Sequence, residues 1–254
     1  MVMMTLLRKE LLEQWRTRRL LVLGALFLFF GFLGPITAQL TPELLKLVGT
    51  TAPGVVIHLP PPSVNDAVGQ YLKNLAQILP LAVLLVAMGS VVGEKERGTL
   101  PMVLAKPIPR GSVLGAKFVA LVTSVAVSLF LGAVAAFYYT QILFGGLPLG
   151  GFLALNLLAG LYLLVVLSLT FLASTVARST VVAAALAIGL WLAQAILAGL
   201  PRVGRASPSA LLGWAAQVGV RIQGKREGLA LWVSLAIVAA SFGVAWWSFR
   251  RQEL

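Results

Sequence analysis

The sequence contains no cysteine, one histidine and one aspartate. The lack of cysteine excludes disulfide bonds, thiolate nucleophiles and cysteine-based metal sites. His58 has no second histidine or cysteine with which to share a metal ion, and Asp66 alone is poor support, so no metal site is expected. No acidic residue lies inside a long apolar run, so the sequence also offers no buried pair of a nucleophile and a base.

Charge is scarce as well: only 11% of the 254 residues are charged, whereas 59% are hydrophobic. A soluble domain has about 25% charged residues, so this chain has too few to cover a water-facing surface. The net charge of +12 could indicate nucleic-acid binding, but the sequence has no soluble module with a basic face to support it. Basic residues beside apolar runs instead indicate retention on the cytoplasmic side and contact with anionic lipid. No nucleic-acid partner is expected.

The chain also lacks the G-x-x-x-x-G-K-[ST] phosphate-binding loop. Its one Gly-Lys pair, Gly224-Lys225, is followed by Arg226 rather than by serine or threonine. The sequence therefore predicts no ATP hydrolysis by this mechanism and no enzyme activity in the chain itself.

Apolar runs free of charge occupy most of the chain. They cover residues 20–42, 74–93, 118–177, 179–201 and 228–249. A helix needs about 20 residues to cross the hydrocarbon core, so four runs fit one span each. The longest fits two, with a turn at GGLPLGG (145–151). The sequence thus predicts an all-α membrane protein with a single transmembrane domain over residues 1–254. Its six spans are predicted at about 20–38, 73–93, 113–143, 152–177, 180–200 and 229–249.

The distribution of basic residues predicts the orientation of these spans. With both termini cytoplasmic, the inner segments hold 13 of the 20 Lys and Arg residues and the outer segments hold seven. This bias favours cytoplasmic ends and a multi-pass protein of the cell membrane. The exception is the segment 201–227, which holds five of the seven outer cations.

Residues 1–19 form a predicted amphipathic helix before the first span. Its apolar positions recur every three or four residues and are Met4, Leu7, Leu11 and Trp15. Lys9, Glu13 and Arg16 fall on the opposite face. Trp15 and Arg16 are typical of a membrane interface. The helix is thus either a surface anchor alone or an anchor that also contacts a cytoplasmic partner.

Two predicted outer segments contain proline. Residues 39–72 include Pro42, Pro53 and Pro60-Pro61-Pro62, which indicates extended, irregular structure. Ser207-Pro208 predicts the start of a short helix lying on the outer surface.

The one long internal segment crowded with charge lies between the second and third predicted spans. Residues 94–117 hold five cations and two acids, Glu94 and Glu96. Thr99 is a candidate cap for a two-turn helix that Pro107 ends. Glu94 and Arg97 lie one turn apart and could form an ion pair. The G-x-x-x-G stretches 89–93 and 111–115 predict close packing of the two spans.

The pattern of this segment resembles a known family. Glu94 to Leu100 reads E-x-E-R-G-T-L, Leu104 to Arg110 reads L-A-x-P-I-x-R, and Gly115 to Lys117 reads G-x-K. The combination is similar to the loop between spans two and three of bacterial type-2 ABC transporter permeases. The nearest branch resembles the permeases of nitrous-oxide-reductase maturation, antibiotic export and sodium export.

This resemblance implies the membrane subunit of an ATP-driven exporter, in which a permease dimer forms the pathway and binds two copies of a separate ABC ATPase. ATP and magnesium would then be bound by the ATPase, and no cofactor by this chain. The expected ATPase-docking residues of this coupling loop are Glu94, Glu96, Arg97, Gly98, Thr99, Leu104, Pro107 and Arg110.

Two other functions remain open from the residues. An ion-coupled transporter or channel normally keeps ionisable groups inside its spans. The predicted spans here hold only weak polar candidates, namely Gln77, Asn156, Ser168, Thr170 and Gln194. A membrane scaffold that transports nothing is the third possibility. The sequence does not indicate a substrate, and no substrate-binding residue is predicted.

Overall fold

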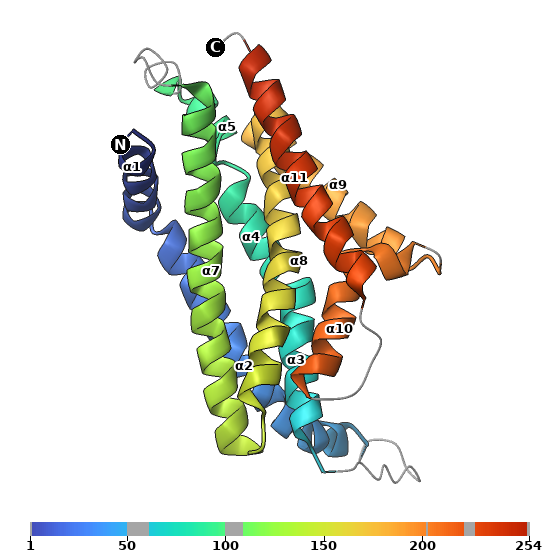
Figure 1. Ribbon diagram of the computed structural model, residues 1–254. Coiled ribbons are helices and arrows are strands. Elements are labelled where there is room, and N and C mark those ends of the chain that lie inside the picture. Colours follow the sequence, from blue (N-terminus) through green and yellow to red (C-terminus); the bar gives the residue numbers. More distant parts are fainter. Residues whose placement is uncertain (1, 50–60, 100–108, 202, 221–226, 253–254) are drawn as a thin grey trace.

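The computed structural model describes residues 2–49, 61–99, 109–201, 203–220 and 227–252 (Figure 1). Within these ranges the chain is helical and contains no strand. The helices are α1 (Val2–Arg16), α2 (Arg19–Gly49), α3 (Val64–Gln77), α4 (Leu79–Ala87), α5 (Val92–Glu96), α7 (Arg110–Leu143), α8 (Leu149–Val176), α9 (Thr180–Ala198), the short 3₁₀ helix η1 (Gly204–Ala206), α10 (Ala210–Gly219) and α11 (Gly228–Arg251).

The described residues include six helical stretches that are long and apolar enough to cross a membrane, which confirms the predicted number of spans. They are Arg19–Glu43, Val64–Glu96, Arg110–Leu143, Leu149–Val176, Thr180–Ala198 and Gly228–Arg251. The prediction of irregular structure over 39–72 was wrong for residues 39–49 and 64–72, which are helical. Residues 61–63 are not helical, and residues 50–60 lie outside the described ranges. Helix α2 continues to Gly49 with Pro35 and Pro42 inside it, and α3 begins at Val64.

Helix α8 lies at the centre of the bundle and packs against α3, α4, α7, α9, α10 and α11. The most extensive interface between two helices joins α2 to α7. Both described chain ends, α5 and the start of α7 gather at one end of the bundle, at the top of Figure 1. We call this the α5 end. The turn between α7 and α8 lies at the opposite end.

The second span is broken between α3 and α4. Pro80 follows the break and has no N–H, so the carbonyl of Ala76 loses its helical partner. The hydroxyl of Tyr162 in α8 donates to this carbonyl at 3.4 Å, and Trp191 of α9 donates to the same hydroxyl at 3.2 Å. Side chains from two other helices therefore stabilise the break.

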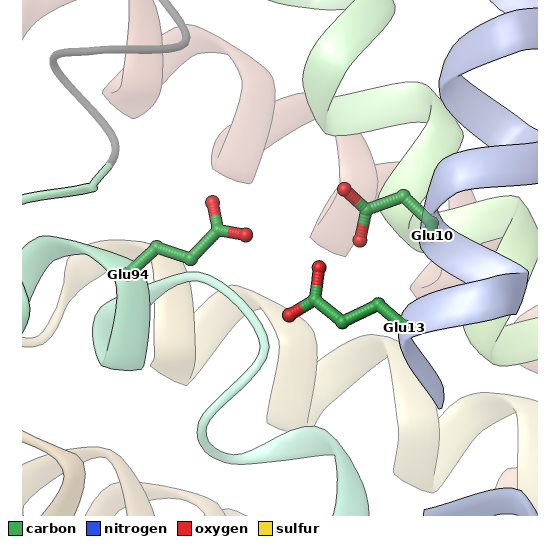
Figure 2. A group of neighbouring side chains, drawn as sticks. All are labelled: Glu10, Glu13 and Glu94. Atoms are coloured by element: carbon green, nitrogen blue, oxygen red, sulfur yellow. The ribbon is translucent and has the colours of Figure 1, made fainter. Parts of the chain in front are cut away.

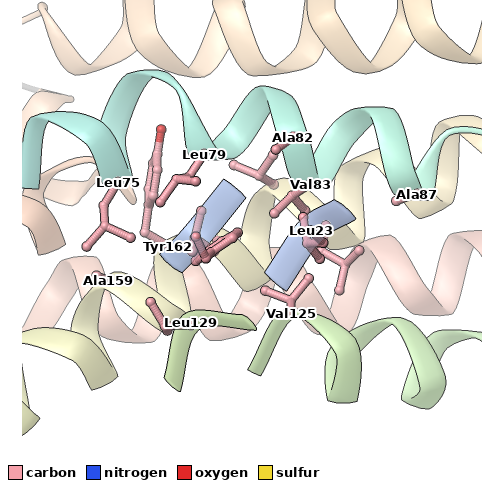
Figure 3. Packing of buried hydrophobic residues seen from close by; sticks show 14 of the residues in the cluster. Leu23, Leu75, Leu79, Ala82, Val83, Ala87, Val125, Leu129, Ala159 and Tyr162 are labelled. Carbon is pink, nitrogen blue, oxygen red and sulfur yellow. The ribbon is translucent and has the colours of Figure 1, made fainter. Parts of the chain in front are cut away.

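Side chains of α2, α4, α7 and α8 form the core beside this break (Figure 3). Leu23 of α2, Val83 of α4 and Leu163 of α8 are almost completely buried in it. The helices most buried by this packing occupy the middle of the bundle, whereas α9 exposes many large apolar side chains to the surroundings. Such an exposed apolar surface is what a lipid-facing span presents.

Two glycines allow α2 and α7 to approach closely. A methyl group at Gly132 would lie 2.6 Å from the carbonyl oxygen of Phe27, and one at Gly31 would lie 2.4 Å from that of Gly132. The predicted role of the G-x-x-x-G stretches was wrong. Added methyl groups at Gly89 and Gly115 would meet Arg19 of α2 and Met3 of α1, so these glycines do not join spans two and three to each other.

The segment between the fifth and sixth spans also differs from the prediction. Helix α10 begins at Ala210, two residues later than the Pro208 start, and packs against α8 and α3. Leu211 and Ala215 are completely buried. A methyl group at Gly151 of α8 would lie 2.6 Å from the carbonyl oxygen of Val218. The helix is therefore packed into the bundle rather than laid on its surface.

Candidate functional site

Helix α5 forms the last part of the second spanning stretch, Val64–Glu96, and contains the first three residues of the coupling loop, 94–96. Its first two amides, those of Val91 and Val92, donate to the hydroxyl of Ser174 in α8 at 3.1 and 3.2 Å. Amides at a helix start have no partner inside the helix, so Ser174 supplies one from a neighbouring span. This contact fixes the beginning of α5 to the end of α8.

The next contacts fix the other end of α5. The ammonium group of Lys95 donates to the carbonyl of Thr175, in the last turn of α8. The carboxylate of Glu96 accepts from the backbone N–H of Thr180 at 2.9 Å and from its hydroxyl. Thr180 is the first residue of α9, where a negative charge is favourable. Lys95 and Glu96 therefore bind the two helix ends that face each other across the 177–179 turn.

Glu94 points the other way, into a buried cluster of charges. Its carboxylate accepts from the ammonium of Lys117 in α7 at 2.6 Å, and the same ammonium donates to both oxygens of Glu10 in α1, at 3.0 and 3.1 Å. Glu94, Lys117 and Glu10 are 5%, 4% and 7% exposed. Lys9 of α1 lies 3.0 Å from Glu10 and 3.6 Å from Glu94. Three helices therefore meet at one buried ammonium group.

Figure 2 shows Glu10, Glu13 and Glu94 directed toward one another from α1 and α5. Their oxygens lie within 4.8 Å of one another, close enough to share a metal ion. However, Lys117 and Lys9 already place two positive charges among these carboxylates. A metal ion would have to displace both ammonium groups, so the arrangement is an ion-pair cluster that holds helices together.

The cluster shifts the pKa values of its half-exposed members. Partial burial lowers the pKa of Lys9, but the charges of Glu10, Glu94 and Glu13 outweigh this effect and raise the pKa above its ordinary value. Partial burial raises the pKa of Glu13, but Lys9, Lys117 and Arg19 outweigh it and hold the pKa below its ordinary value of 4.5. Both groups are therefore charged at neutral pH.

A pH dependence follows from the lowered pKa of Glu13. Its charged form stabilises the folded chain above pH 4.5, and this contribution is lost as the pH falls through the folded-state pKa. We expect Glu13→Gln to lower the thermal unfolding midpoint in detergent near pH 7, and to lower it less as the pH drops below 4.5. Glu43→Gln, at an exposed position of α2, is the control. An effect of Glu13→Gln that does not change with pH would contradict the assignment.

Helix α1 is held against α7 by polar residues. Gln14 accepts a hydrogen bond from Ser124 of α7, one turn along α1 from Glu10. Leu7 and Leu11 are half-buried, Trp15 is 56% exposed, and Arg16 is exposed. The sequence pattern did not reveal that the side of α1 facing the protein carries a glutamate and a glutamine. Contact of the apolar side with lipid stays a prediction.

The remaining expected docking residues mostly lie on the surface of the α5 end. Arg97 donates through Nε to the carbonyl of Gly93 at 2.9 Å, so the expected ion pair with Glu94 is not formed. Gly98 has a φ of 66°, a conformation that favours glycine. Arg110 donates through one nitrogen to the carbonyls of Arg250 and Gln252, at the end of α11.

Two of the expected residues, Leu104 and Pro107, lie outside the described residues, as does most of the predicted helix after Thr99. Sequence reasoning did not identify Ser174, Lys117 and Glu10 as partners of α5. Of these, only Lys117 carried a signal, since it ends the G-x-K pattern. Ser174 and Glu10 are distant from α5 in the sequence, and no motif around either residue marks it as a partner.

Comparison with known proteins agrees with this architecture. Residues 4–213 match the family described as ABC-2 family transporter protein. The chain is 27% identical over 258 aligned positions to the uncharacterized transmembrane protein YxlG of Bacillus subtilis, and the alignment covers 99% of this chain and 98% of that protein.

Two further relatives are the probable ABC transporter permease proteins NosY. The one from Pseudomonas aeruginosa is 32% identical over 199 positions, covering 75% of this chain and 66% of the relative. The one from Stutzerimonas stutzeri is 31% identical over 143 positions, covering 56% and 47%. Since the family match spans most of the chain, this protein belongs to the ABC-2 family and is the multi-pass membrane subunit of an ABC transporter.

Proposed function

We propose that this chain is the permease of an ABC exporter, and that separate ATPase subunits drive it through the coupling loop, residues 94–110. In this proposal two copies of the chain form the pathway, and each binds one ATPase copy on the cytoplasmic side of the membrane. ATP and magnesium are bound by the ATPase. The α5 end is then the cytoplasmic end, with both termini on that side.

The observation that carries the proposal is the anchoring of α5 to four other helices. Ser174 and Thr175 bind it to α8, Thr180 binds it to α9, and Lys117 binds it to α7 and, through Glu10, to α1. A five-residue helix has little stability of its own. Anchoring on this scale is therefore expected where a short element has to transmit force rather than bend.

The contacts divide the expected docking residues into two groups. Glu94 faces inward and supports the loop from behind, since its carboxylate is buried against Lys117. Arg97, Gly98 and Thr99 are exposed at the end of α5 and are available to a partner. Glu96 and Arg110 are also exposed, although each already binds a helix end. Direct contact of an ATPase with these residues, and with Leu104 and Pro107, stays a prediction.

The relatives support a transporter but leave direction and cargo to be proposed. The NosY proteins carry the description of probable ABC transporter permeases, which fits a chain that depends on a partner ATPase. Export is our proposal from the resemblance of the loop to permeases of export systems. A substrate is not proposed.

Co-purification tests the docking surface. We expect affinity-tagged wild-type protein, extracted from its native host in mild detergent, to bring down an ABC ATPase. Arg97→Glu should abolish this recovery, because it reverses an exposed charge within the coupling loop and breaks no hydrogen bond to another described helix. Since Glu96 binds the start of α9, a change there would also disturb the fold and is the poorer choice.

The matched control is Lys73→Glu, the same charge reversal at an exposed position of α3 away from the α5 end. It should leave ATPase recovery unchanged. If Arg97→Glu recovers as much ATPase as the wild-type protein does, Arg97 is not part of the docking surface. Wild-type protein that never brings down an ATPase would contradict the proposed function itself.

A further inference from the structure

We propose that Lys117 is the positioning residue that couples the loop to α1, so that α1, α5 and α7 move as one body when the loop is displaced. The consequence for transport rests on the proposed function. The attachment of α1 to α5 through Lys117, which we call the joint, does not. Nothing in the sequence pattern assigned Lys117 a role beyond closing a G-x-K motif.

The first step is the position of Lys117 relative to the loop. The part of the coupling loop between the two helices, residues 97–109, follows α5 and precedes α7. Glu94 lies just before this stretch, and Lys117 lies two helical turns into α7. Their 2.6 Å ion pair therefore closes the base of the loop, and its two ends cannot separate without breaking this ion pair.

The second step is the link to α1. The ammonium that binds Glu94 also donates to both oxygens of Glu10, so one side chain of α7 holds α5 and α1 together. Lys9 also reaches Glu94 directly, but at 3.6 Å and with 46% of its side chain exposed. A longer, hydrated ion pair holds its partners less firmly than a buried one with short hydrogen bonds.

The third step is that Lys9 is a poor replacement for Lys117, because it is half-exposed and lies 3.6 Å from Glu94. The second oxygen of Glu94 is buried without a hydrogen-bond partner among the described residues. Without Lys117, Glu94 and Glu10 would face each other as buried like charges with only the half-exposed Lys9 between them, and would repel. The expected response is separation of α1 from α5, while α1 keeps its packing on α7 and the hydrogen bond between Gln14 and Ser124.

Distance measurements by electron spin resonance test the joint in the permease alone. Because the chain has no cysteine, spin labels can be placed only at introduced cysteines: Leu12→Cys on α1 and Val181→Cys on α9, both exposed. Helix α9 is the reference since Glu96 fixes its start to α5. In lipid nanodiscs we expect one narrow distance in the wild-type background and its loss, by broadening, in Lys117→Met.

Two further variants make this result specific. Glu10→Gln removes the charge of the α1 carboxylate that binds Lys117 and leaves the pair of Lys117 and Glu94 intact, so it tests the joint even if Lys117→Met fails to fold. It should also broaden the distance. Lys95→Met is the matched control: it removes a lysine of α5 that binds α8 and not α1, and should keep the narrow distance. A narrow distance in both Lys117→Met and Glu10→Gln would overturn the proposal.

A second measurement distinguishes transmission of movement from the loop to α1 from simple stabilisation of the fold. We expect the wild-type permease to stimulate ATP hydrolysis by its co-purified ATPase, and Glu10→Gln and Lys117→Met to bind the ATPase but lose the stimulation. If the distances broaden while stimulation of ATP hydrolysis stays at the wild-type level, Lys117 only stabilises the fold. That result would overturn the proposal that it transmits movement of the loop to α1. If no ATPase binds the wild type, the proposed function fails, while the distance measurement still decides the joint.

Discussion

Lys117→Met is expected to reduce the stability of the permease more than any other single change at the α5 end. The substitution keeps an unbranched side chain, one atom shorter, but leaves Glu10 and Glu94 buried without the ammonium group that binds both by short hydrogen bonds. Only the half-exposed Lys9 then lies near both carboxylates. Removing one partner of a buried ion pair costs about 3–5 kcal/mol, because the remaining charge is then without both water and its counter-ion. Denaturant unfolding in detergent micelles, followed by tryptophan fluorescence, measures the loss of stability.

A triple variant provides the control for this prediction. Replacing Glu10, Glu94 and Lys117 together by methionine removes every charge of the buried core of the cluster, while Lys9 remains half-exposed and can reach water. Apolar replacement of a whole buried ion pair is often close to neutral. We therefore expect the triple variant to be more stable than Lys117→Met alone. If Lys117→Met unfolds at the wild-type denaturant concentration, Lys117 is not a buried counter-ion.

Gly132→Val is expected to separate α2 from α7. The first added carbon would lie 2.6 Å from the carbonyl oxygen of Phe27, well inside van der Waals contact. The atom it meets belongs to the backbone, so the clash cannot be relieved by a rotamer change and the two helices must move apart. Overpacking of this kind typically costs about 1–3 kcal/mol. The effect should be large here because the interface between α2 and α7 is the most extensive between two described helices.

Gly189→Val in α9 is the matched control, since an added carbon there meets no atom within 4 Å. The same substitution should leave the thermal unfolding midpoint in detergent close to that of the wild type, whereas Gly132→Val should lower it clearly. Equal midpoints for the two variants would show that α2 and α7 are not closely packed at this point.

The spans were predictable because each is a run of about 20 or more residues without charge, and hydrocarbon accepts little else. The ends of the spans were less predictable. Proline over 39–49 suggested irregular chain, yet α2 continues through Pro35 and Pro42. Similarly, the G-x-x-x-G stretches occur on helices that do not meet each other through these glycines, while the glycines that do meet, Gly31 and Gly132, belong to no G-x-x-x-G stretch.

The candidate site was located by its concentration of charge and by its resemblance to a family, but the roles of its residues were not. Arg97 was expected to pair with Glu94 because the two are one turn apart, and this local rule failed. Glu94 instead lies against Lys117, which is 23 residues away and buried with it. A buried carboxylate needs a buried cation, and its identity depends on which helix packs behind it.

By itself, then, the sequence determined the number of spans, the all-α class and the position of the charged loop, because these depend on the cost of exposing polar groups to lipid. Only the tertiary structure decided that Glu10, Glu94 and Lys117 form one cluster and that Ser174 and Thr180 hold α5. The bond between Lys117 and Glu10 joins residues 107 positions apart. The geometry of such contacts is set by helix packing, which periodicity and spacing within one helix do not contain.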